Sequence, residues 1–529
     1  ICSVIKCGKR ATELKDGYFI KNNISKILEE KKNKYTENRV KIDGLFSGAG
    51  ESITNHLGWM TLYIPHTDIL YVPAGRTWAW GGWNLFEWDS FFNTLLLSVE
   101  NLKMAYNELK GVFYIQYPDG NIPNYRGGSG GTPDRSQPPV GAFVLWKIYL
   151  KSGKNKSLLK KYYPLLKKWY YWWVDKSVTG KPRRDGNEDG LLEWGDDKSD
   201  LQYAKYESGM DDSPLWDNVK IIKETGTMNL NALDLNCLRA VEAECLSKMA
   251  SELGYNKEQQ AFKNDYEKIK KLINEKMWNE KEGFYYDLYW DGNLSDKKAA
   301  SSFYPLLAGI ASEERATLVV KHLVNNREFW GKYVVPTISR DDTTYKDQQY
   351  WRGTIWPPTN YLIYQGLKRY GFDELSGEYA RKSAELFLNQ YLKDGSCREN
   401  YNSITGEGGG ERFQSWGPLF ALIAIEEIID IDPWNNGLRF GSLGIQENIK
   451  IKNIKIAGNI YNVTSGSITL LEENGVEVFR ADNRCIVRGY VYTKDKLSFV
   501  LKNLEELNIT VQPKNITPVS YTHLTLPTN

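Results

Sequence analysis

The chain has 529 residues and a mass of 60.8 kDa, which predicts a large domain with a smaller one appended. Its 68 Lys and Arg residues nearly balance 66 Asp and Glu residues, so the net charge of +2 suits a neutral small-molecule partner and gives no reason to expect nucleic acid or an anionic membrane. No run of eighteen apolar residues occurs, so we expect no membrane span. The six cysteines lack CxxC spacing, which argues against a disulfide framework or a zinc site.

The first 70 residues are mixed and polar. They include a Lys- and Glu-rich amphipathic stretch near 24–35 and a strand-like segment at 62–69. We interpret residues 1–70 as the remnant of an upstream β domain or as the lead-in to the next domain. The chain starts at Ile1 without a Met or a signal-peptide pattern, so we expect a missing upstream start, and the cellular compartment stays open.

From Asp89 to about Ile429 the apolar residues recur at helical spacing, in blocks separated by long loops rich in Gly, Pro, Asp and Trp. This pattern predicts a mainly α domain over 71–436. Long helices joined by long loops fit an α/α toroid better than a bundle, and we expect the functional side chains on the loops. The predicted helices are 90–108, 138–152, 156–175, 228–253, 257–277, 301–310, 314–325, 359–371, 375–391 and 416–429.

The apolar pattern changes to a period of two from about Phe440, as at Ile449 and Ile451. This predicts a small C-terminal antiparallel β domain over 437–517, joined through residues 430–437. Residues 519–524 resemble the translation of a sequencing adaptor, so we expect 518–529 to be a tail outside the fold.

Two loops bring several carboxyl groups together. Residues 207–214 contain Glu207, Asp211 and Asp212, and residues 398–408 contain Glu399 and Glu407. Hydrolysis of a glycoside needs two such groups, one protonated to assist the leaving oxygen and one ionised to activate water. The 18 Trp and 34 Tyr residues suit a sugar-binding cleft, although a Trp-rich core explains the composition equally well.

Four segments occur in an order that resembles the signature motifs of glycoside hydrolase family 63 and its relatives, the trehalases and mannosylglycerate hydrolases. They are residues 73–76 with 80–92, then 207–214, 350–361 and 399–408. The resemblance implies an (α/α)6 barrel and inversion of configuration at an α-linked sugar. It also implies that Asp211 is the general acid and Glu399 the general base.

The same resemblance implies a sugar pocket lined by Trp88, Asp89, Trp351, Arg352 and Trp356, with Gln137, Gly209 and Trp416 as further candidates. Asp and Arg can grip adjacent hydroxyls, and Trp supplies a stacking face. Asp89 could instead cap a helix that begins at Ser90.

The charged neighbours of the two carboxyl groups predict different pKa values. Asp211 has Asp212 and Glu207 nearby in the sequence, and their like charges should raise its pKa. Glu399 follows Arg398, which should keep the Glu399 carboxyl ionised. We therefore expect the acid at Asp211 and the base at Glu399.

The segment containing Asp185, Asn187 and Asp189 is typical of the first half of a calcium loop, with Gly190 at the turn and Asp196 at position 12. A solvated Asp/Asn/Gly turn explains it equally well. We expect no cofactor for catalysis, with Ca2+ as the candidate structural ion.

The expected function is an exo-acting, inverting α-glycosidase that releases a terminal sugar, glucose by preference, from an oligosaccharide or a small glycoside. Trehalase and mannosylglycerate or glucosylglycerate hydrolase stay open as alternatives. A catalytically silent glycan-binding protein is the alternative from another class, and the presence of both Asp211 and Glu399 argues against it.

Overall fold

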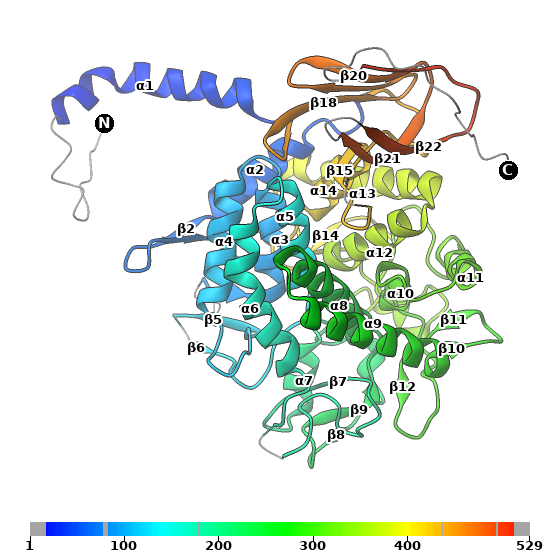
Figure 1. Cartoon of the computed structure of the whole chain (residues 1–529). Coiled ribbons are helices and arrows are strands. Elements are labelled where there is room, and N and C mark those ends of the chain that lie inside the picture. The colour runs from blue at the N-terminus through cyan, green and yellow to red at the C-terminus, as the bar shows by residue number, and fades with distance from the viewer. Residues whose placement is uncertain are drawn as a thin grey trace.

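The computed structural model describes residues 17–77, 83–128, 130–177, 180–435, 437–492 and 496–512. The expected tail at 518–529 and residues 80–82 of the first motif lie outside these ranges. A helical domain carries a β domain at one end, and α7 (Leu201–Glu207) with the strands β7 (Glu193–Gly195), β8 (Ile221–Ile222) and β9 (Thr227–Asn231) lies at the opposite end (Figure 1).

The helical domain is a closed ring. Each inner helix contacts the next, and the last contacts the first. The inner helices are α3 (Glu87–Leu97), α5 (Gly141–Lys151), α8 (Leu233–Leu253), α10 (Tyr304–Leu307), α12 (Pro357–Tyr370) and α14 (Leu419–Ile428). This arrangement is a helical barrel, in agreement with the predicted mainly α domain.

A second layer of helices surrounds the ring, and the sequence explains the two layers. All ten residues of the inner helix α14 are buried, whereas only Phe262, Ile269 and Ile273 are buried in the outer helix α9. A helix that is apolar all round belongs inside, and a helix with one apolar stripe belongs at the surface. The outer helices that contact the ring are α2 (Ala49–Met60), α4 (Leu102–Tyr114), α6 (Lys156–Trp172), α9 (Asn256–Lys276) and α13 (Asp373–Asp394).

Several predicted helices have different bounds in the structure. The segment 90–108 is split between α3 and α4, because the Asn101 side chain accepts a hydrogen bond from the Met104 backbone N–H at 3.2 Å and caps a new helix. The segment 228–253 begins as the strand β9 before α8 starts at Leu233. Helix α11 (Glu313–Leu323) matches its prediction closely, whereas α2 and α7 were not predicted.

The β domain consists of two antiparallel sheets. One sheet has the order β1-β17-β18-β19-β20-β23 and the other β15-β16-β21-β22. Alternate residues of β17 are buried on each side of an irregularity between Ile451 and Ile454, as the period of two predicts. The strands are β1 (Lys41–Asp43), β15 (Ile429–Ile431), β16 (Leu438–Phe440), β17 (Ile449–Ile456), β18 (Asn459–Ser465), β19 (Thr469–Glu473), β20 (Val476–Ala481), β21 (Cys485–Tyr492), β22 (Leu497–Asn503) and β23 (Ile509–Val511).

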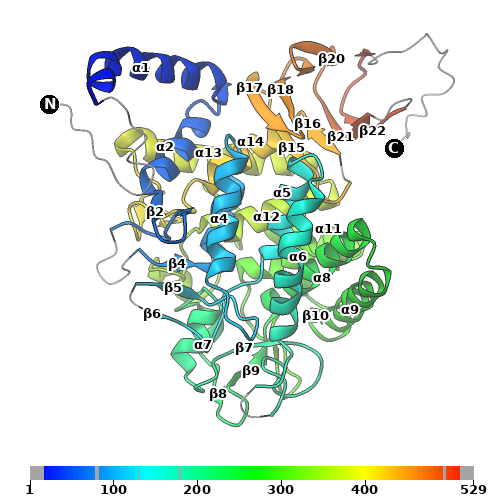
Figure 2. The ribbon, with the colours of Figure 1, turned by 60° about the vertical axis from the view of Figure 1, so that its left-hand side comes forward.

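Both predicted domain borders fall inside continuous structure. The segment 430–437, read as a linker, starts inside β15, which continues directly from α14 and pairs with β16 from Leu438 onward. Within residues 1–70, β1 pairs with β17, and α2 packs on α13, α14 and α3. The described part of this segment is therefore shared between the two domains, although α1 (Gly17–Asn38) extends away from the body (Figure 2).

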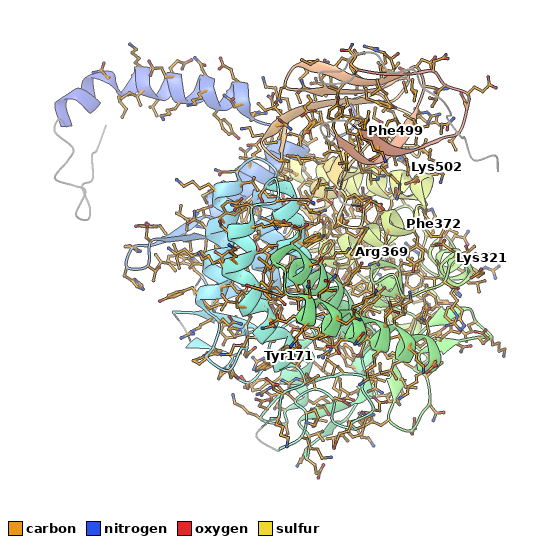
Figure 3. All side chains as sticks on the ribbon, viewed as in Figure 1. Tyr171, Lys321, Arg369, Phe372, Phe499 and Lys502 are labelled. Carbon is orange, nitrogen blue, oxygen red and sulfur yellow. The ribbon has the colours of Figure 1, made fainter. Side chains whose placement is uncertain are left out.

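The β domain is fixed to the helical domain at the end of α12. Lys502 on β22 donates a hydrogen bond to the Gly371 carbonyl at 3.2 Å, and Arg488 on β21 donates to the Lys368 carbonyl at 2.8 Å. Lys502, Phe372 and Arg369 mark this region in Figure 3. No helix of the described residues has the length and apolar content to cross a membrane.

Candidate active site

A cavity of about 610 Å³ contains most of the predicted site residues. Eight of the ten predicted catalytic and binding residues line it, although they come from segments far apart in the sequence. These eight are Trp88, Asp89, Gln137, Gly209, Asp211, Trp356, Glu399 and Trp416.

Asp211 lies just beyond α7, in a turn that its neighbours hold in place. Gly209 has a φ of +68°, and a Cβ added there would lie 2.9 Å from the Trp88 ring, so this turn needs a glycine. The Met210 carbonyl accepts a hydrogen bond from Trp216 Nε1 at 2.8 Å. The turn before Asp211 thus packs against Trp88 and is hydrogen-bonded by Trp216.

The pKa of Asp211 is raised to about 7. Burial is the main cause, followed by the negative charges of Glu399 and Asp212, while Arg135 acts in the opposite direction. Glu207, which we expected to contribute, instead accepts hydrogen bonds from the buried Arg184 at 2.6 and 2.8 Å. The prediction of a raised pKa is therefore right for Asp211, but Glu207 is not among its causes.

Glu399 is buried and its pKa is also raised to about 7, mainly by burial. Two donors oppose this shift by stabilising the anion: the Glu411 backbone N–H at 2.7 Å and the Tyr350 hydroxyl at 3.3 Å. Arg398 does not stabilise the Glu399 anion, because its guanidinium donates a hydrogen bond to Ser396 at 3.1 Å and pairs with Asp394 at 3.5 Å. The expected ion-pair partner of Glu399 is thus wrong, and hydrogen bonds take its place.

The two carboxyl groups differ in the donors that serve them. Within the described residues, Asp211 receives only its own backbone N–H, whereas Glu399 receives two donors from other residues. The donors to Glu399 favour its ionised form, and the charge of Glu399 raises the pKa of Asp211, so the surroundings favour the proton on Asp211. The pair can therefore present one protonated and one ionised carboxyl group to the same cavity.

Asp89 lies in the first turn of α3 and is fully buried in the cavity wall. Its Oδ1 accepts a hydrogen bond from Gln414 Nε2 at 2.7 Å. Helix α3 begins at Glu87, so Asp89 is not the N-cap that the alternative interpretation required. Burial raises the Asp89 pKa well above its usual value, and the charge of Glu399 raises it further.

Three tryptophans form an aromatic wall around the two carboxyl groups. Trp416 meets Trp88 edge to face at 5.2 Å and Trp356 at 5.9 Å between ring centroids. Gln137 Oε1 accepts a hydrogen bond from the Trp88 backbone N–H at 3.4 Å. Such a wall can contact the apolar face of a sugar ring while polar neighbours meet its hydroxyls.

Trp351 and Arg352 do not line this cavity. Trp351 is buried and stacks on Trp356 at 3.6 Å, so it supports the wall from behind. Arg352 forms a bidentate ion pair with Asp217, in which its two terminal nitrogens lie 2.9 and 3.1 Å from the carboxylate oxygens. Its Nε forms a second ion pair with Asp347 at 2.8 Å. Arg352 lines a neighbouring cavity instead.

The cavity also contains residues that we did not predict. Arg135 lies two positions before Gln137, Tyr350 opens the third motif, and Gln414 lies two positions before Trp416, so inspection of the motif flanks could have found them. Tyr203 and Tyr206 come from α7, whose last residue, Glu207, opens the second motif, so the same inspection could have found Tyr206. The remaining unpredicted lining residues are Phe86, Asn124 and Tyr125.

The candidate calcium loop is closed by its own hydrogen bonds. Asp185 accepts from the Gly190 N–H at 3.2 Å, Asn187 accepts from the Asp189 N–H at 3.2 Å, and Asp189 pairs with Lys276 at 3.1 Å. In the described part of the chain, no three His, Cys, Asp or Glu side chains converge as a metal would require. The side chains fit a hydrogen-bonded turn better than a metal site, and calcium binding here stays a prediction.

The model of a protein family described as the mannosylglycerate hydrolase MGH1-like glycoside hydrolase domain matches residues 82–417. A periplasmic trehalase from Salmonella newport (strain SL254) is 26% identical over 410 residues, which cover 70% of this chain and 69% of the trehalase. Mannosylglycerate hydrolase MGH1 from Selaginella moellendorffii is 25% identical over 411 residues, which cover 64% of this chain and 79% of that protein.

Solved structures share the helical barrel at lower identity. The GH63 mannosylglycerate hydrolase from Thermus thermophilus, in complex with glucose, aligns with a TM-score of 0.59 at 20% identity, covering 70% of this chain and 98% of that one. The neutral trehalase from Saccharomyces cerevisiae aligns with a TM-score of 0.53 at 17% identity, covering 69% and 76%. With a family match across most of the barrel, the chain belongs to the mannosylglycerate hydrolase MGH1-like glycoside hydrolases and is a glycoside hydrolase of the family 63 type.

Proposed function

We propose that the protein is an exo-acting, inverting α-glycosidase in which Asp211 protonates the leaving oxygen and Glu399 deprotonates the attacking water. The observation that carries this proposal is the unequal pair of buried carboxyl groups in one cavity. Glu399 accepts two hydrogen bonds that stabilise its anionic form, and Asp211 lacks donors from other residues in the described structure. The resemblance to this family implies an (α/α)6 barrel, and the ring of six inner helices supports it.

For the released sugar we propose glucose. Asp89, fixed by Gln414, would accept hydrogen bonds from ring hydroxyls, and the wall formed by Trp88, Trp356 and Trp416 would contact the ring face. The similar Thermus hydrolase has a crystal structure in complex with glucose, which supports this choice.

A second candidate substrate is a glycoside of a small acid, as the name mannosylglycerate hydrolase says of the Selaginella relative. Arg135 favours it, because this cation lines the cavity and its Nε is buried without a hydrogen-bond partner among the described residues. Its guanidinium already pairs with Asp134 at 3.2 Å, so a carboxylate would satisfy the remaining N–H.

The assignment of the two carboxyl groups is tested by Asp211→Asn and Glu399→Gln, assayed on α-glucosyl fluoride and on natural α-glucosides. We expect each variant to lose at least about 10²-fold in turnover, as for general acid–base residues. Azide should restore the Glu399 variant more than the Asp211 variant, because azide can replace the activated water. The control is Glu407→Gln, on the same loop but exposed and away from the cavity, which should keep parental turnover. Parental turnover in either of the first two variants would remove that residue from the mechanism.

A further inference from the structure

One short segment, residues 411–414, supplies hydrogen-bond donors to two carboxyl groups of the cavity. At its start, the Glu411 backbone N–H donates to Glu399 Oε2 at 2.7 Å. At its end, Gln414 Nε2 donates to Asp89 Oδ1 at 2.7 Å. The position of this segment therefore decides whether Glu399 and Asp89 keep these donors.

Helix α2 contacts the segment from behind. His56 is buried, and its Nε2 lies 2.8 Å from the Gln414 carbonyl oxygen. Because a carbonyl can only accept, Nε2 carries the hydrogen and His56 is the donor. One turn later in α2, the Trp59 ring packs on Phe413 with 4.8 Å between the centroids, and the His56 ring stacks on the same Phe413 at 6.3 Å. Neither His56 nor Trp59 lines the cavity, so both contact the site only through the segment.

These two residues belong to a part of the chain that the family model does not match. The match covers residues 82–417, whereas α2 spans Ala49–Met60. Other residues of α2, Ile53 and Leu57, line a different cavity with Leu96 and Leu97 of α3. The contact of α2 with the segment 411–414 is therefore separate from its packing on α3.

We propose that His56 and Trp59 are positioning residues of the active site, which hold the segment 411–414 where its donors reach Glu399 and Asp89. This inference rests on the proposed function, in which Glu399 is the base. The Gln414 carbonyl also accepts a hydrogen bond from the Gly417 N–H at 3.0 Å. Loss of the His56 donor thus leaves no buried acceptor without a partner, so the effect should fall on the position of the segment rather than on the fold.

The expected effect on the Glu399 pKa has a definite sign. The Glu411 N–H lowers this pKa more than the Glu411 carboxylate raises it, so a displaced segment raises the pKa of Glu399. His56 does not titrate in the same range, because burial lowers its pKa to about 4. The other titratable groups of the cavity are carried by other segments and include Asp89, Arg135, Tyr203, Tyr206, Asp211 and Tyr350.

The test measures the pH profile of kcat/KM on α-glucosyl fluoride for the full chain and its variants. His56→Phe keeps a ring against Phe413 and removes the donor. Its acidic limb, where Glu399 must lose a proton to act as the base, should move up by about one pH unit, and kcat/KM at the parental optimum should fall about tenfold, the effect of one hydrogen bond to a charged group. His56→Gln should restore both properties toward the parent, because the amide can donate in place of Nε2. Trp59→Ala should move the limb in the same direction by a smaller amount.

Leu57→Ala is the matched control. This residue is buried in the same helix and lines the cavity on α3, so its loss should lower the free energy of unfolding and leave the acidic limb in place. A shift in Leu57→Ala equal to that in His56→Phe would overturn the inference and make α2 a general support of the fold.

The remaining results separate this inference from the proposed function. An unmoved limb in both His56→Phe and Trp59→Ala would overturn the positioning role. If His56→Phe does not fold, Trp59→Ala decides alone, since the Trp59 side chain is 47% exposed and its loss opens no buried cavity. Glu399→Gln is assayed beside them: parental turnover in that variant would overturn the proposed function and this inference together, whereas an inactive Glu399→Gln with parental profiles at positions 56 and 59 would overturn this inference alone.

Discussion

The turn behind the Glu399 carboxylate should not tolerate a side chain. Gly410 has a φ of +62°, and a Cβ added there would lie 2.8 Å from Glu399 Cβ and closer still to Oε2. The next residue, Glu411, donates its backbone N–H to that same oxygen at 2.7 Å. In Gly410→Ala, either the carboxylate or the turn must move, and the hydrogen bond that favours the anion is lost.

We expect kcat/KM of Gly410→Ala to fall about 10²-fold, the effect of misplacing a catalytic group by about 1 Å. The free energy of unfolding should fall by only about 1–2 kcal/mol, the cost of a left-handed alanine. Gly395→Ala is the matched control, since Gly395 has a φ of +71° and nothing lies within 4 Å of its added Cβ. Steady-state kinetics and thermal unfolding of both variants measure these effects. Parental kcat/KM in Gly410→Ala, or an equal loss in Gly395→Ala, would refute the reasoning.

Other properties of the site can be tested in the same way. Asp212→Asn removes a negative charge that raises the pKa of Asp211, so the alkaline limb of the pH–kcat profile, where Asp211 loses its proton, should shift to lower pH; an unmoved limb would remove Asp211 as the titrating acid. Glu207→Gln breaks a fully buried ion pair with Arg184 and should lower the free energy of unfolding by about 3 kcal/mol, measured by urea denaturation; a change below about 1 kcal/mol would contradict this role. If the loop 185–190 holds calcium, a chelator should lower the melting temperature and added calcium should restore it, whereas an unchanged curve would favour the hydrogen-bonded turn.

The sequence predicted the site better than it predicted the contacts within it. Asp211 and Glu399 are almost two hundred positions apart, yet the order of the motifs assigned both to one pocket, where the structure places them. The electrostatic partner of Glu399 was not predictable in this way. Arg398 faces Asp394 while Glu399 faces the cavity, and their adjacency in the sequence does not show that the two side chains separate.

Periodicity identified most of the long helices but not their ends or their long-range pairing. The helical spacing runs through residues 98–101, where only the capping side chain of Asn101 marks the break. The three-residue strand β1 has too few residues for a period to be visible, and its partner β17 lies about 400 positions later. The sequence therefore could not show that the N-terminal segment completes the C-terminal sheet.

The stereochemistry of the first-formed product tests the central claim most directly. If Glu399 activates water while Asp211 protonates the leaving oxygen, hydrolysis is a single displacement and inverts the anomeric carbon. Proton NMR of the hydrolysis of an α-glucoside, read before mutarotation, should therefore show β-glucose first. Initial appearance of the α-anomer would contradict the inverting mechanism and the assignment of Glu399 as a base acting through water.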